Sequence, residues 1–265
     1  MKNNVKTRIA SLLGIALILA ALMFSFTACK NSSNSDDDTP VLDWGKIADY
    51  DSTFADRILG TATAALDGTN GRYQETVLGN FIMDAIAEYA RYVSGEKVDF
   101  ALHNGQNLKI FNLEAGELSN AAITALIGED PLYVSIFTGS QVKDVIQGFV
   151  NSDTKTTWKA NCAVMVSKEL SYIIDTSTNP PTATNIKVNG VDIDESKEYR
   201  IAAGNFIGAN TQAGRTFLPI LPVEKKTNYS TPLNQAVAMY VLVKGTIKPS
   251  DYPLGRYTGV VPVIP

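Results

Sequence analysis

Apolar residues recur along this chain of 265 residues with two different periods. From Glu75 to Tyr92 they return every three or four positions, which predicts an amphipathic helix with one apolar stripe. The same spacing predicts a helix over 44–60 and another that begins at Thr138. Short apolar runs bounded by turn-forming residues predict strands at 98–102, 132–137, 163–167, 171–175, 184–188 and 199–203.

Turn and capping residues divide these elements. Ser119 is placed to cap a helix, and the pair Asn189-Gly190 between two apolar-alternating segments predicts a hairpin. Pro232 stands where a last helix begins and Gly245 where it ends. Helices and strands therefore interleave over a region large enough to bury a core, which predicts an α/β domain of mixed, layered sheets and helices.

The N-terminus predicts targeting to a membrane. A positively charged start precedes an apolar run over 9–26, which indicates a secretory signal peptide over 1–28. Cys29 follows directly, so the segment resembles the signal of a bacterial lipoprotein, in which this thiol receives a diacylglyceryl group. An uncleaved anchor is the alternative, because the apolar run is just long enough to span a bilayer. Lipidation would hold the protein in the bacterial cell envelope, on the periplasmic or outer surface of a membrane.

The remainder of the chain is a tether and one domain. Residues 29–43 are rich in Asn, Ser and Asp, which predicts a disordered tether before a domain over 44–265. Removing residues 1–28 removes three positive charges and no negative one, which moves the formal net charge from −4 to −7. Such an acidic body argues against nucleic-acid binding, which needs clustered Lys and Arg. Cys162 lies in an apolar run, which predicts a buried thiol without a disulfide.

Three motifs that lie far apart in the sequence belong together. They are Arg72-Tyr-Gln-Glu-Thr-Val-Leu-Gly-Asn80, Asn104-Gly-Gln-Asn-Leu-Lys109 and Asn205-Phe-Ile-Gly-Ala-Asn-Thr-Gln212. Their order, spacing and flanking strands resemble the C-terminal, substrate-binding domain of the bacterial 5′-nucleotidase family. The resemblance implies an α-β-β-α layered fold in which the three loops converge on one nucleotide. It also makes 44–60 the helix that links this domain to the family's catalytic domain.

The resemblance assigns several positions to the binding of a nucleotide or nucleoside. They are Arg72, Asn104, Asn107, Lys109, Phe206 and Gln212. Arg72 would pair with a phosphate or ribose oxygen, with an exposed residue before a helix as the alternative. Asn104 corresponds to a position that contacts the base or the ribose. Phe206 would stack on a base, with a buried core aromatic as the alternative.

Some of these positions depart from the family pattern. Asn107 replaces a glycine, and Lys109 replaces an arginine, which keeps the charge but loses the bidentate geometry. Gly128 stands where the family has a second stacking aromatic, and Gln212 stands where it has an aspartate. The residues that form the fold therefore match the family pattern better than the residues of the binding site do.

Catalytic residues of that family are not expected in this sequence. The family's other domain holds two metal ions with several histidines and carboxylates, whereas this chain contains a single histidine, His103. The sequence also contains no G-x-S-x-G elbow for a nucleophilic serine. It therefore predicts no catalytic residue, no metal site and no cofactor.

Three functions remain open. The first is a lipid-anchored, non-catalytic module that binds a nucleotide or nucleoside. The second is the substrate-binding part of a split 5′-nucleotidase, a hydrolase of nucleotide catabolism, which works with a separate metallophosphatase chain. The third is a structural or adhesion lipoprotein in which the cleft is vestigial.

Overall fold

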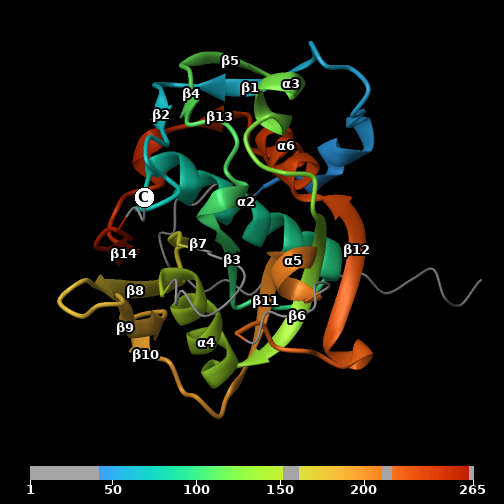
Figure 1. Ribbon diagram of the computed structural model, residues 1–265. Coiled ribbons are helices and arrows are strands. Elements are labelled where there is room, and N and C mark those ends of the chain that lie inside the picture. Colours follow the sequence, from blue (N-terminus) through green and yellow to red (C-terminus); the bar gives the residue numbers. More distant parts are fainter. Residues whose placement is uncertain (1–41, 152–160, 211–216, 263–265) are drawn as a thin grey trace, which may run out of the picture. The chain divides into compact units, whose positions relative to one another are not determined.

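The computed structural model describes residues 42–151, 161–210 and 217–262 (Figure 1). The predictions for the signal peptide, for Cys29, for Gln212 and for nearly all of the tether therefore lie outside the described residues. Within the described ranges, the structure contains no helix that is both long and apolar enough to cross a membrane.

The longer helices begin and end at capping residues. α2 (Val77–Ser94) begins where the Thr76 side chain accepts a backbone hydrogen bond, and it ends at Gly95 in the left-handed conformation. α4 (Gly139–Val150) begins with a capping box at Thr138. The other helices are η1 (Trp44–Asp49), η2 (Gly105–Asn107), α3 (Asn120–Thr124), α5 (Asn205–Gly208), η3 (Val223–Lys225), α6 (Leu233–Lys244) and η4 (Pro249–Asp251).

The strands of the described residues form four sheets. They are β1 (Ile58–Ala62), β2 (Leu66–Asp67), β3 (Phe100–Asn104), β4 (Asn112–Leu113), β5 (Gly116–Ser119), β6 (Pro131–Thr138), β7 (Val164–Val166), β8 (Leu170–Asp175), β9 (Thr182–Val188), β10 (Val191–Asp192), β11 (Glu198–Gly204), β12 (Lys226–Pro232), β13 (Thr246–Ile247) and β14 (Tyr257–Thr258). The largest sheet has the order β12-β6-β11-β3-β7. The others are β13-β1-β5, β10-β9-β8-β14 and β2-β4.

The five-stranded sheet separates two hydrophobic cores. Along β3, Ala101 belongs to the core with α2 and α6, whereas Phe100 and Leu102 belong to the core with α4 and the sheet β10-β9-β8-β14. This alternation follows from the two-residue period of a strand. In Figure 1, α6 lies toward the top of the view and α4 toward the bottom, with α2 crossing between them. The predicted mixed α/β class is confirmed.

The predicted helix over 44–60 is not formed. The chain makes the short 3-10 helix η1 at the start of this segment, and β1 begins at Ile58. β1 pairs with β13 and β5, and it brings Gly60 so close to the backbone of Gly245 that a side chain there would collide. Phe54, which the helical spacing places on the apolar face, is 63% exposed. Strand pairing with distant segments therefore overrides the local pattern.

The other predicted elements are present, with ends that differ by a few residues. The helix predicted over 75–92 is α2, and the predicted strands correspond to β3, β6, β7, β8, β9 and β11. Asn189 and Gly190 join β9 to β10, and both have positive φ, as a tight hairpin turn requires. Pro232 is the N-cap of the last helix, α6, rather than its first residue.

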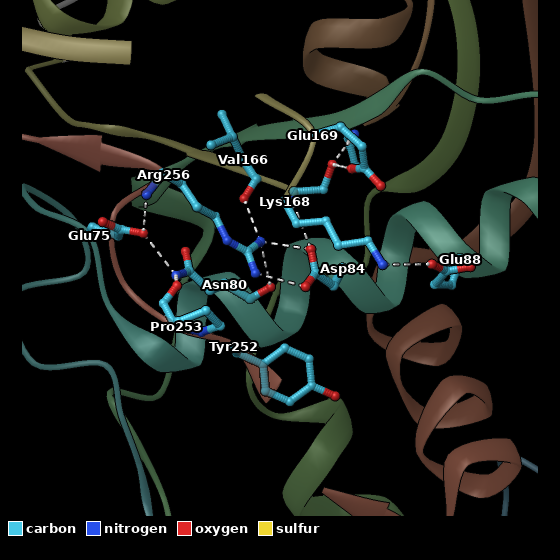
Figure 2. Close-up of polar contacts among 12 residues, drawn as sticks. Glu75, Asn80, Asp84, Glu88, Val166, Lys168, Glu169, Tyr252, Pro253 and Arg256 are labelled. Carbon is cyan, nitrogen blue, oxygen red and sulfur yellow. Dashed lines mark hydrogen bonds and ion pairs between the residues drawn. The ribbon is translucent and has the colours of Figure 1, made fainter. Parts of the chain in front are cut away.

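A buried ion pair ties the C-terminal loop to α2. Figure 2 shows the Arg256 guanidinium between Asp84 of α2 and the carbonyl group of Val166 of β7. It donates to the two Asp84 carboxylate oxygens at 2.6 and 2.7 Å and to Val166 O at 3.1 Å. Beside it, Glu75 accepts hydrogen bonds from the backbone N–H groups of Gly255 and Arg256. These contacts hold α2, β7 and the loop before β14 together.

Candidate functional site

Two of the three motif loops lie at one edge of the five-stranded sheet. β3 and β11 are parallel, so their carboxyl ends lie at the same edge, and the antiparallel strand β6 begins there at Pro131. β3 ends at Asn104 and continues into η2, and β11 ends at Gly204 and continues into α5. Ligands of α/β proteins bind preferentially outside such strand ends. This edge is therefore the candidate binding site.

The first motif reaches the same edge through backbone contacts. Gly105 N donates to Ala163 O, and Ala163 N donates to Arg72 O, both at 2.9 Å. A Cβ atom on Gly105 would lie 2.8 Å from Gly71 O and 2.9 Å from Arg72 O, so only glycine permits this approach. The structure thus brings the Arg72 and Asn104 segments together, as the motif order predicted.

Two exposed cations stand on these loops. Arg72 and Lys109 are both exposed, and no ion pair found among the described residues includes either of them. The Arg72 guanidinium carbon lies 5.5 Å from the centroid of the Tyr73 ring. Asn104 lies between them in sequence and is 8% exposed. The site therefore presents positive charge that the protein's described acidic groups do not neutralise by direct contact.

The described residues of the third motif are mostly buried and add little exposed surface to the site. Phe206, predicted to stack on a base, lies in the short helix α5 and is 9% exposed. Its ring centroid lies 6.0 Å from that of Phe149, in the core that contains α4. This environment agrees with the alternative interpretation, in which Phe206 is a core aromatic. Gln212 belongs to the part of the motif that the structure does not describe.

The sequence did not reveal a polar cluster between the second and third loops. His103 is fully buried near the end of β3, and its Nε2 lies 2.7 Å from Asn107 Nδ2 and 3.6 Å from Asp130 Oδ2. Asn107 Nδ2 also donates to Asp130 Oδ2 at 3.4 Å. Gly204, directly before the third loop, packs closely against this cluster. A Cβ atom there would lie 2.9 Å from His103 Nε2.

The cluster favours an ionised Asp130. Hydrogen bonding with His103 lowers the pKa of Asp130, an effect that burial partly offsets and that the charge of Lys109 reinforces. His103 Nδ1 is buried without a hydrogen-bond partner in the part of the chain that the structure describes. No group of three or more His, Cys, Asp or Glu side chains among the described residues is placed to hold a metal ion. One signal was available in the sequence, since the single histidine directly precedes Asn104.

Asn107 and Gly128, which the resemblance marked as departures from the family pattern, lie side by side. Residues 107–109 lie beside residues 126–128, with Lys109 N donating to Leu126 O at 2.8 Å. A side chain at Gly128 would collide with Asn107 Oδ1. The side chain of Asn107 therefore occupies the space in which a side chain at position 128 would lie.

Comparison with known proteins places this domain among its relatives. Residues 58–217, more than half of the chain, match the sequence profile described as 5′-nucleotidase, C-terminal domain. The chain belongs to this family. We therefore interpret the three motif loops, with Arg72 and Lys109, as parts of a 5′-nucleotidase C-terminal domain.

The relatives are longer proteins. The trifunctional nucleotide phosphoesterase protein YfkN of Bacillus subtilis (strain 168) is 26% identical over 161 residues, which are 57% of this chain and 10% of that protein. The 5′-nucleotidase precursor from Thermus thermophilus has a TM-score of 0.62 and 19% identity, covering 77% of this chain and 40% of that one. The NAD nucleotidase of Haemophilus influenzae has a TM-score of 0.60 and 14% identity, covering 77% and 38%. These structural likenesses establish the fold.

Proposed function

We propose that this protein is a lipid-anchored module that binds a nucleotide or nucleoside without hydrolysing it. The observation that carries the proposal is the meeting of the Arg72 and Asn104 loops at the carboxyl ends of β3 and β11, with Arg72 and Lys109 exposed. Cations of this kind hold a phosphate by charge-assisted hydrogen bonds. The amides of Asn104 and Asn107 offer donors and acceptors to a base or ribose. Membership of the family supports a nucleotide as the ligand.

The non-catalytic part of the proposal rests on side-chain chemistry. Two-metal hydrolysis of a phosphate ester uses a dense set of ligands that clamp the attacking and leaving oxygens. The 265 residues contain one histidine, and that histidine is buried against Asn107. A second function is favoured by the length of the relatives, of which the chain spans 40% or less. In that function the protein is the substrate-binding part of a nucleotidase whose metallophosphatase domain is a separate chain.

Calorimetry and a phosphate assay together test the proposal. Titration with AMP, ADP and adenosine is expected to give saturable binding, and AMP with Mg²⁺, Mn²⁺ or Zn²⁺ is expected to release no phosphate. Steady phosphate release by the pure protein would contradict the non-catalytic role. Release that requires an added metallophosphatase chain would favour the second function. Absence of binding across the whole panel would leave a structural or adhesion role.

The two exposed cations are expected to recognise phosphate rather than the nucleoside. The double variant Arg72→Ala/Lys109→Ala should weaken AMP binding by about tenfold or more, because charged hydrogen bonds are lost. Adenosine binding should change little, and calorimetry measures both. Lys97→Ala is the control, since Lys97 has an 80% exposed side chain paired with Asp99. Equal weakening of AMP and adenosine by the double variant would contradict a phosphate role.

The lipid anchor is expected to depend on Cys29 alone. Cells grown with a clickable fatty acid should label the natural protein and the variant Cys162→Ala, whose altered residue is buried in the domain. The variant Cys29→Ser should carry no label, because no thiol remains at the predicted acylation position. Label retained on Cys29→Ser, or absent from the natural protein, would exclude lipidation at this cysteine.

A further inference from the structure

The nitrogen of the Asn107 side-chain amide contacts groups within the protein, and its oxygen is available to a ligand. Its Nδ2 atom contacts both His103 Nε2 and Asp130 Oδ2, at 2.7 and 3.4 Å. Its Oδ1 atom lies over Gly128 and makes no hydrogen bond among the described residues. Asn107 itself is partly exposed, whereas His103 is fully buried. The oxygen is therefore the atom that this side chain presents to the site.

The acidic partner fixes this orientation. An ionised carboxylate only accepts hydrogen bonds, so Asp130 favours the nitrogen of the facing amide over its oxygen. A rotated Asn107 amide would place its oxygen 3.4 Å from a carboxylate oxygen, where two acceptors would face each other. Asp130 thus acts as a positioning residue for Asn107.

Resting on the proposed function, we infer that Asn107 selects a nucleotide whose base carries a hydrogen-bond donor, such as the exocyclic amine of adenine, over one with a carbonyl group there. The amide oxygen accepts a hydrogen bond from an amine. It repels a carbonyl oxygen, which is also an acceptor. Because the amide cannot rotate without opposing Asp130, it cannot adapt to a carbonyl group as a free asparagine would.

Three purine nucleotides that differ at position 6, and in IMP also by a hydrogen on N1, test the inference by calorimetry. AMP carries an amine at position 6, IMP a carbonyl, and purine riboside 5′-monophosphate neither group. AMP is expected to bind about tenfold more tightly than both of the others, the effect of one hydrogen bond in a sheltered site. 2′,3′-Dideoxy-AMP and 2′,3′-dideoxy-IMP should show the same ratio of affinities, because the base rather than the ribose supplies the donor to Asn107. Equal affinity for AMP and IMP, tighter IMP binding, or a ratio that disappears without the ribose hydroxyls would overturn the inference.

A matched pair of variants tests the positioning role of Asp130. Asp130→Asn keeps the shape but can donate or accept, so the Asn107 amide becomes free to rotate and the AMP-to-IMP ratio should fall to about twofold or less. Glu129→Gln makes the same change of charge at the exposed neighbouring residue and should leave the ratio unchanged. A ratio preserved in Asp130→Asn would overturn the role of Asp130. Failure of the natural protein to bind any nucleotide would instead refute the proposed function, and with it this inference.

Discussion

Replacing Arg256 with alanine is expected to destabilise the protein by about 3–5 kcal/mol, because Asp84 would remain buried without its counter-charge. Both side chains are almost fully buried, and the guanidinium group contacts both Asp84 oxygens (Figure 2). The same guanidinium donates to the carbonyl oxygens of Asn80 and Val166, which would also lose a partner. Urea unfolding followed by circular dichroism measures the loss.

Two further variants distinguish the effect of the unpaired buried charge on stability from the effect of lost packing. The double variant Arg256→Met/Asp84→Leu should recover much of the stability, because an apolar pair removes both charges together. Lys168→Ala is the surface control: its ammonium lies 3.7 Å from Glu88 and its side chain is 59% exposed. That ion pair is expected to contribute at most about 1 kcal/mol. A loss below about 1 kcal/mol in Arg256→Ala would show that water reaches Asp84.

The buried ion pair of Arg256 and Asp84 also connects stability to the candidate site. Asp84 belongs to α2, whose first turn is part of the Arg72 motif, and Val166 belongs to β7, which pairs with β3 beside Asn104. Arg256 therefore joins two of the segments that position the motif loops. Loss of the ion pair should lower ligand affinity as well as the free energy of unfolding.

Most of the fold followed from local patterns because the elements concerned carry their own signals. α2 has an apolar stripe and a Thr76 cap, and every residue of β3 is buried, so the short apolar run over 100–102 was enough to predict the strand. β12 (Lys226–Pro232) lacks such a run, because it is an exposed edge strand of Lys, Thr, Asn, Tyr, Ser and Pro. Its formation depends on pairing with β6, which no local pattern reveals.

The sequence predicted which loops lie at the candidate site, but it did not predict the side-chain contacts between them. The order of the motifs predicted that the Arg72 and Asn104 segments lie together, and the structure shows this contact; the binding roles of Arg72, Asn104 and Lys109 stay predictions. The cluster of His103, Asn107 and Asp130 requires β6 to run antiparallel beside β11, which places residue 130 next to the end of β3. A motif read along the sequence contains no information on that pairing.

The variant Gly105→Val is expected to abolish measurable AMP binding. A valine there would force its Cβ atom to within about 3 Å of Gly71 O and Arg72 O, which are backbone atoms that cannot rotate away, so the two loops must separate. The cost in stability should be about 1–3 kcal/mol, small enough for a folded variant. Gly45→Val is the control, because its nearest neighbour is the exposed side chain of Asp43. If Gly105→Val does not fold, Gly105→Ala provides the test with a smaller shift. Natural affinity for AMP in either folded variant would show that the contact between the Arg72 and Asn104 loops does not form the binding site.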